Sequence, residues 1–266
     1  IFDDLDRVQH MFYHNRLDVA QAWYQKLDAF VGEVSQRVEN WGGKYNYLIM
    51  SDHGFTTYQQ KIHLNCWLAE NRYLTLNNGS TEGDLSSIDW QKTKAYAVGL
   101  NSVYLNVAGR EGKGVVGANE IEPLLAEIQQ KLMGWNGPDG KSVMQRIRLK
   151  HEVYNGAYTR LGPDLVIGYA PGYRASSETG LGKVPQNLVE ANHDHWGADH
   201  CVDSDVVPGV IFANRDLQNF GGVSFRDIPF LAIGKHLDQS HIKPPSQVSG
   251  GSQKDLENRL KGLGYL

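Results

Sequence analysis

The stretch YNYLIMSDHGF, residues 45–55, decides the fold we expect for this chain. Its first six residues are aromatic and aliphatic enough to form a short buried strand. Asp52 and His53 follow directly, and two polar side chains at the end of a buried strand are costly unless something engages them. Adjacent strand residues point to opposite faces, so both can serve one site only if the chain turns, which Gly54 permits. The plain alternative is a strand that simply exits into a loop.

A helix is expected directly before this strand, over residues 16–41. Its apolar side chains recur at helical spacing, and Gly42 and Gly43 end it. These apolar positions are Val19, Trp23, Leu27, Phe30, Val31, Val34 and Val38. A helix followed by a buried strand that ends in polar residues is the layout of an open parallel α/β sheet, which binds ligands at the carboxyl ends of its strands. The pattern therefore predicts an α/β fold.

Further elements are expected along the rest of the chain. Strands are predicted at 95–98, 103–107, 164–169 and 206–212, a helix at 120–133, and a late helix after a capping box at 224–227. Beyond Pro244 the text is linker-like. We expect one domain over residues 1–245, followed by a linker and C-terminal tail at 246–266.

The composition is that of an ordinary globular protein. The chain is 41% hydrophobic and 21% charged, with a formal net charge of -4. This charge argues against binding to nucleic-acid polymers and against a polybasic membrane anchor. No apolar run reaches the roughly 20 residues that a membrane span needs. No targeting signal is visible, so the compartment stays open, and Cys66 and Cys201 are expected to be two free thiols.

Near the N-terminus, Asp6 and His10 form an Asp-x-x-x-His pair. Positions four apart share one face of a helix, so the two side chains could grip one metal ion. His14 extends the same face, and Asp3 and Asp4 are close, so the choice of ligands is open. The alternative is a solvated Asp–His pair at a helix end.

A third polar cluster is NHDHWGADH, residues 192–200. It contains His193, His195 and His200, and the residues alone do not decide which of them is a ligand. Zinc accepts imidazole nitrogen and carboxylate oxygen alike. Two ions about 3.5–4 Å apart can hold the entering and leaving oxygens of a phosphoryl transfer. Together, the three clusters suggest a dinuclear hydrolytic site.

The order of these motifs resembles the alkaline phosphatase superfamily, and most closely its type I phosphodiesterase/nucleotide pyrophosphatase branch and related phosphohydrolases or phosphomutases. The supporting text includes SDHGFTTYQQKIHLNCWLAENRYL and HWGADHCVDSDVVPGVIFANR. The resemblance implies a three-layer α/β/α sandwich with a mostly parallel central sheet. It also implies a metal-dependent phosphoester hydrolase acting on a small phosphorylated substrate. A phosphomutase of the same superfamily, or a non-catalytic metal-binding relative, are the alternatives.

Carried over to this chain, the family pattern places Asp6, His10 and His200 on one metal ion and Asp52 and His53 on the other. The resemblance implies two divalent ions, zinc or manganese. His193 and His195 then become neighbours of the site.

The resemblance also implies residues that this chain does not show. In the family, a Thr or Ser nucleophile and one more Asp ligand precede the Asp-x-x-x-His element, whereas this chain starts five residues before Asp6. We therefore expect both upstream of Ile1, with the fold N-terminally incomplete and the chain alone inactive. Thr56 and Thr57 are poor substitutes for the nucleophile.

Two other sequence features are weaker indications of function. The glycines 112, 114 and 117 match a dinucleotide-binding spacing but lack the acidic residue that should follow about 20 positions later, so we expect no such cofactor. Arg174 could grip a substrate phosphate, or it could be a loop arginine without such a role.

Overall fold

The strands predicted at 95–98 and 103–107 both form, and they are joined as a hairpin. β3 (Ala95–Ala97) and β4 (Ser102–Leu105) pair antiparallel, and Gly99 takes the left-handed φ of +84° that their connection requires. The computed structural model describes residues 1–215, 217 and 224–233. The predicted linker and tail at 246–266 lies outside these residues.

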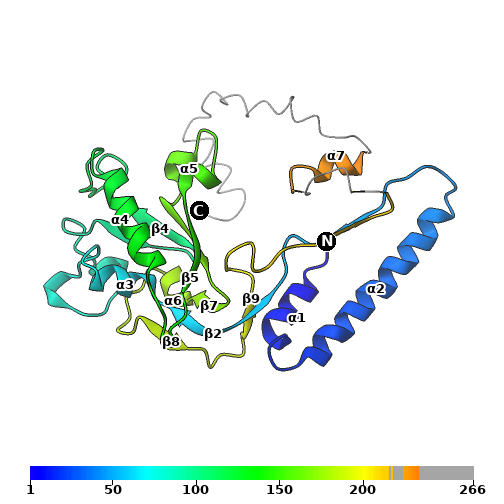
Figure 1. Ribbon diagram of the computed structural model, residues 1–266, viewed down its shortest axis with the longest axis horizontal. Helices are drawn as coiled ribbons and strands as arrows, with labels where there is room; N and C mark the ends of the chain where they lie inside the picture. Colours follow the sequence, from blue (N-terminus) through cyan, green and yellow to red (C-terminus); the bar gives the residue numbers. More distant parts are fainter. Residues whose placement is uncertain (216, 218–223, 234–266) are drawn as a thin grey trace.

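Helices and strands alternate irregularly along the described chain (Figure 1). The remaining helices are α1 (Asp4–Phe12), α2 (Leu17–Glu39), α3 (Leu64–Glu70), α4 (Ile121–Met133), α5 (Lys150–Val153), α6 (Ser177–Gly180) and α7 (Ile228–Ala232). The remaining strands are β1 (Leu48–Met50), β2 (Thr56–Ile62), β5 (Met144–Leu149), β6 (Leu165–Tyr169), β7 (Gly172–Ala175), β8 (Val189–Ala191), β9 (Ala198–Asp199) and β10 (Ile211–Ala213).

The strands form three small sheets. One has the order β3-β4-β6-β5, a second has the order β7-β2-β8 with β9 also pairing to β2, and the third joins β1 to β10. Among the strands of the described residues, β2 and β7 are the one pair that runs parallel; the other strand pairs are antiparallel. The α/β class is confirmed, but the mostly parallel central sheet was wrong for this part of the chain, and a three-layer sandwich is not seen in it.

The physical reason for this difference lies in the connections. Parallel neighbours need a long crossover, usually a helix, whereas the four residues between β3 and β4 allow only a hairpin. β5, which the sequence analysis did not predict, pairs antiparallel with β6. The prediction of a parallel sheet rested on one helix followed by one strand at residues 16–50. That strand, β1, pairs antiparallel with β10.

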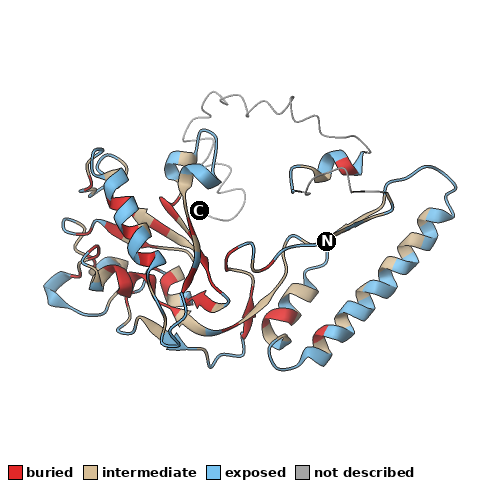
Figure 2. Cartoon of the chain, in the orientation of Figure 1, coloured by how far each residue is buried: buried red, intermediate tan, exposed pale blue. Residues whose placement is uncertain are grey.

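The hydrophobic core lies where α3 and α4 cover the larger sheets (Figure 2). The helix predicted at 120–133 forms as α4, and Leu124, Leu125, Ile128 and Leu132 make up its buried face. β6 contributes Leu165, Ile167 and Tyr169, each almost without exposure. Cys66 and Cys201 are free thiols, as expected.

The strand predicted at residues 45–50 is shorter and less buried than expected. β1 covers only residues 48–50, and Met50 is exposed. Its partner β10 begins after Pro208 and Gly209, so the strand predicted at 206–212 was also displaced toward the C-terminus. These two strands form a separate ribbon away from the core (Figure 1).

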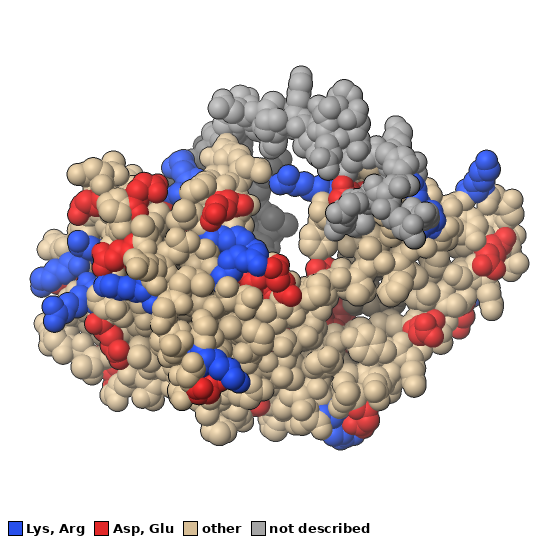
Figure 3. All heavy atoms as spheres, viewed as in Figure 1, with Lys and Arg blue, Asp and Glu red and all other residues tan. Residues whose placement is uncertain are grey.

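α2 forms over nearly all of the predicted range, but its apolar face does not enter the core. Ala20 is its one fully buried position, and α2 lies beside α1 at one end of the molecule (Figures 1 and 2). Among the described residues, no helix combines the length and apolarity that crossing a bilayer requires. On the face shown in Figure 3, acidic and basic side chains are interspersed.

Candidate metal centre

α1 supplies the first two side chains of the site. Asp6 and His10 lie one turn apart on this helix, with His10 Nε2 3.5 Å from Asp6 Oδ2. His10 is buried, and its Nδ1 lies 2.8 Å from the backbone oxygen of Ala198. Because a carbonyl oxygen only accepts hydrogen bonds, Nδ1 carries a proton, and Nε2 is the ring nitrogen that faces Asp6.

His53 is oriented in the same way after β1. Its Nδ1 donates to the backbone oxygen of Gly54 at 3.1 Å, so that Nε2 faces Asp6 Oδ1 at 3.9 Å. Gly54 permits this geometry for a reason that the sequence did not show. Its φ is not in the left-handed region, but a Cβ there would lie 2.9 Å from the Pro208 backbone oxygen.

His200 completes the group directly after β9. Its Nε2 lies 3.5 Å from Asp6 Oδ1, and its ring stacks on that of His53 with centroids 3.7 Å apart. Burial, aided by His53, lowers the pKa of His200 against the opposing charges of Asp199 and Asp6. The ring is therefore neutral near pH 7, which is the form that binds metals.

The distances within this group suit bound cations better than direct contacts. Asp6 Oδ1 lies 3.5–3.9 Å from the Nε2 atoms of His200 and His53, beyond normal hydrogen bonds. Two ligands of one tetrahedral zinc ion, each about 2.0–2.2 Å from it, stand roughly 3.3–3.6 Å apart, so small movements would bring these atoms to that spacing. Among the described residues, the buried Asp6 Oδ1 also finds no hydrogen-bond partner. The donor set thus fits a divalent metal ion.

Asp52 and the other candidates occupy different surroundings. Asp52 Oδ2 lies 3.6 Å from His53 Nε2, with its side chain 76% exposed. His193 and His195 are exposed, and His14 lies over Gly197, where an added Cβ would collide with its ring. The structure therefore brings together Asp6, His10, Asp52, His53 and His200.

Asp199 is a functional position that the sequence analysis missed. Its Oδ1 accepts from the backbone N–H groups of His200 and Cys201, and its Oδ2 accepts from Arg174 and Trp196. Trp196 in turn stacks on His10, with ring centroids 3.8 Å apart. With four donors its oxygens are saturated, so Asp199 orients the neighbouring histidines.

Arg174 is committed to this network and is not a free phosphate-binding arginine. It lies in β7, is 8% exposed, and pairs with Asp199. Burial alone would raise the pKa of Asp199, but Arg174 and hydrogen bonds from Cys201 and Trp196 lower it to about 2. The structure therefore places Arg174 in a strand and not in a loop.

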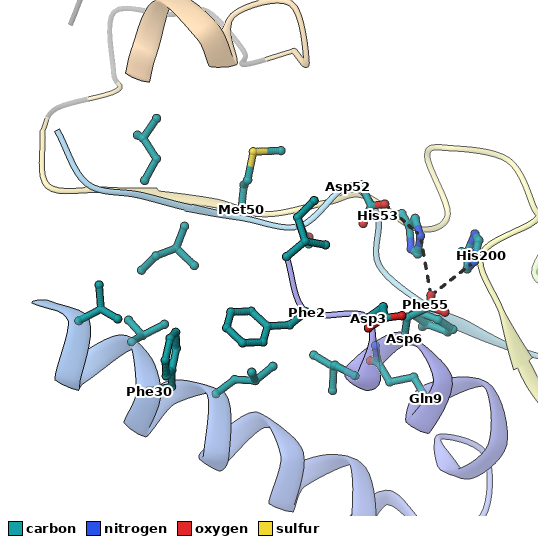
Figure 4. Close-up of a pocket in the computed structure, with 18 of the residues that line it drawn as sticks. Phe2, Asp3, Asp6, Gln9, Phe30, Met50, Asp52, His53, Phe55 and His200 are labelled. Atoms are coloured by element: carbon teal, nitrogen blue, oxygen red, sulfur yellow. Dashed lines mark ion pairs between the residues drawn. The ribbon is translucent and has the colours of Figure 1, made fainter. Parts of the chain in front are cut away.

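A cavity of about 960 Å³ adjoins the centre. Asp6, Asp52, His53 and His200 line its polar end, and Phe2 and Phe30 lie along its length (Figure 4). Leu27, Val31 and Val34 of the predicted apolar face of α2 line it too. The apolar periodicity of α2 thus describes the wall of this cavity.

The fold and the site define a mixed α/β protein with carboxylate and imidazole ligands gathered on one centre. Residues 1–196 match the family type I phosphodiesterase / nucleotide pyrophosphatase, and the chain belongs to this family of the alkaline phosphatase superfamily. The family predicted from the motif order is thereby confirmed.

Among solved structures, the chain is similar to phosphonoacetate hydrolase from Sinorhizobium meliloti 1021 in complex with phosphonoformate. The identity is 17% and the TM-score 0.47, covering 86% of this chain and 49% of that one. The chain thus spans about half the length of that structure. No match is found among curated proteins.

Proposed function

We propose that this chain carries the metal-binding part of a phosphoester hydrolase that acts on small phosphorylated substrates. The observation that supports it is the convergence of the His53 and His200 Nε2 atoms on Asp6 Oδ1 at 3.9 and 3.5 Å. Two imidazole nitrogens that face one carboxylate oxygen beyond hydrogen-bond distance leave a space that bound cations would fill. Membership of a phosphodiesterase family supplies the reaction class.

We assign two divalent ions, zinc or manganese, to this centre. Asp6, His10 and His200 would hold one, and Asp52 and His53 the other. Asp6 lies between the two proposed groups of ligands. Its Oδ2 faces His10, and its Oδ1 faces His53 and His200. Asp199 would fix the backbone of His200 through its Oδ1 and so keep that ring in place.

Bound metal ions would neutralise charge on the phosphoryl oxygens and lower the pKa of an attacking hydroxyl group. Following the family pattern, we propose that this hydroxyl belongs to a Thr or Ser outside residues 1–266, so the chain by itself binds metal without turnover. Thr56 and Thr57 do not match the family pattern, because they follow the Asp-His-Gly element and do not precede the Asp-x-x-x-His element. We further propose that residues 1–245 belong to one domain and contribute to a three-layer α/β/α sandwich in the full-length protein.

The test measures hydrolysis by the full-length protein. Bis(p-nitrophenyl) phosphate and p-nitrophenyl phosphate are offered with zinc or manganese, before and after EDTA treatment. We expect metal-dependent release of nitrophenol that falls by at least about a hundredfold in Asp6→Asn and His53→Ala. Asp4→Asn, an exposed change on the same helix, is the matched control. Undiminished hydrolysis in Asp6→Asn would contradict the proposal, and ³¹P NMR of the products separates a hydrolase from a phosphomutase.

A further inference from the structure

A second group of potential metal ligands lies at the opposite end of β2. His63 directly follows this strand and caps α3, Glu178 lies in α6, and Glu190 lies in β8. Thr56, at the start of β2, pairs with Asp199 beside the first centre. Six residues of extended strand separate the two ends by on the order of 20 Å. We propose that His63, Glu178 and Glu190 form a second, separate binding site for one divalent metal ion.

The geometry of His63 carries this proposal. The residue is 1% exposed, and its Nδ1 is a buried polar atom without a hydrogen-bond partner among the described residues. Glu178 Oε2 lies 4.0 Å from Nδ1, whereas Nε2 donates a hydrogen bond to Glu190 Oε2 at 3.4 Å, which leaves Nδ1 as the ring nitrogen open to an ion. One ligand atom from each of the three residues fits within a span of 4.8 Å.

These distances match shared coordination. An oxygen 4.0 Å from Nδ1 is too far to accept a hydrogen bond from it. A metal ion with bonds of about 2.0–2.2 Å could reach both atoms with little movement. Leaving a buried ring nitrogen unpaired costs about 1–3 kcal/mol, and an ion would remove this penalty.

Two lysines leave the relevant carboxylate oxygens free. Lys61 Nζ lies 3.2 Å from Glu190 Oε1, and Lys183 Nζ lies 3.4 Å from Glu178 Oε1. In both glutamates it is therefore the other oxygen, Oε2, that faces His63. The lysines hold the carboxylates in position and offset part of their mutual repulsion.

The protonation state of His63 agrees with a ligand role. Burial lowers the pKa of His63, although Glu190 and Glu178 act in the opposite direction. A neutral imidazole with two carboxylates suits zinc, and less well manganese, whereas magnesium and calcium prefer oxygen ligands. The ion would join β2, α6 and β8, which gives the site a structural role.

The test is equilibrium dialysis of the 266-residue chain against Zn²⁺, with bound metal measured by elemental analysis. The first centre is removed in an Asp6→Asn/His53→Ala/His200→Ala background, so the remaining zinc reports the second site. We expect about one equivalent to remain in this background. Glu178→Gln and Glu190→Gln should each weaken its binding by about tenfold or more, since even partners outside the ligand set contribute 10–100-fold.

Glu82→Gln, an exposed and equally conservative change, is the matched control and should leave the affinity unchanged. Because replacing the buried His63 could disturb folding, circular dichroism accompanies every variant and the two glutamine variants carry the conclusion. The same variants in the otherwise intact chain should lose one equivalent and keep the metal of the first centre. No zinc in the triple background, or binding indifferent to both glutamine changes, would overturn the second site without affecting the first.

Discussion

The imidazole rings of His53 and His200 stack with centroids 3.7 Å apart and planes inclined by 16°. The two residues are far apart in sequence, yet both direct Nε2 toward the same oxygen of Asp6. This arrangement of two rings around one carboxylate oxygen is the geometry on which the proposed metal binding rests.

Zinc should stabilise the chain through this centre. At a zinc concentration about 100 times the dissociation constant, a single site adds about 2.7 kcal/mol to the free energy of unfolding. We expect a clear rise in Tm when zinc is added to EDTA-treated protein, measured by differential scanning fluorimetry. Asp6→Asn should reduce that rise, and His193→Ala, at an exposed histidine outside the cluster, should not. Equal rises in the wild type and Asp6→Asn would contradict the assigned ligands.

Asp199→Asn should destabilise the fold and loosen the centre. The change leaves the buried Arg174 without its charged partner, and breaking a buried ion pair costs about 3–5 kcal/mol. Urea unfolding in EDTA measures this loss in the absence of metal. As a control, Asp205→Asn removes the exposed partner of Arg146 and should cost less than about 1 kcal/mol. A loss as small as that of the control would show that Asp199 is not a positioning residue.

Gly54→Ala should disturb the turn that presents His53. The added Cβ would lie 2.9 Å from the Pro208 backbone oxygen, so the backbone must shift, at a cost of about 1–3 kcal/mol. We expect weaker zinc binding by isothermal titration calorimetry together with a lower Tm. At Gly43 nothing lies within 4 Å of the added atom, so Gly43→Ala should stay within about 0.5 kcal/mol. Unchanged zinc affinity in Gly54→Ala would argue against this role of the turn.

Stability should fall in acid because of Asp164. Burial acts to raise its pKa, but hydrogen bonds from Arg110 and Lys150 hold that pKa below the unfolded value of 3.8. As the pH falls below about 4, the unfolded chain therefore binds the proton first, and the stabilisation present at higher pH is lost.

Urea unfolding at pH 7 and pH 3 measures this effect. The free energy of unfolding should drop more between the two pH values for the wild type than for Asp164→Asn. Asp28→Asn, at an exposed site, should keep the wild-type dependence. The same pH dependence in all three proteins would exclude the Asp164 contribution.

Much of this molecule was predictable from local sequence. The helix predicted at 120–133 forms as α4, and the strands predicted at 95–98 and 103–107 form as β3 and β4. The spacing of Asp6 and His10 predicted one helix face, because a helix repeats every 3.6 residues. The order of the motifs also indicated the family, which the match over residues 1–196 confirms.

Local sequence could not predict strand pairing or burial. β1 has the composition of a buried strand but pairs only with β10 and remains partly exposed. Whether two strands pair parallel or antiparallel depends on which distant segments of the chain come together. A strand has the same apolar composition in both cases. For the same reason, the apolar face of α2 was recognisable while its position along a cavity wall was not.

The sequence by itself determined the residue types, the helix faces and the family, because these follow from spacing and motif order along the chain. Only the tertiary structure decided that Asp199 is saturated by Arg174 and three other donors and so does not compete with Asp6. It also decided that His200, and neither His193 nor His195, meets His53. These contacts join residues that are distant in sequence, and their free energies depend on distance and burial, which no local pattern records.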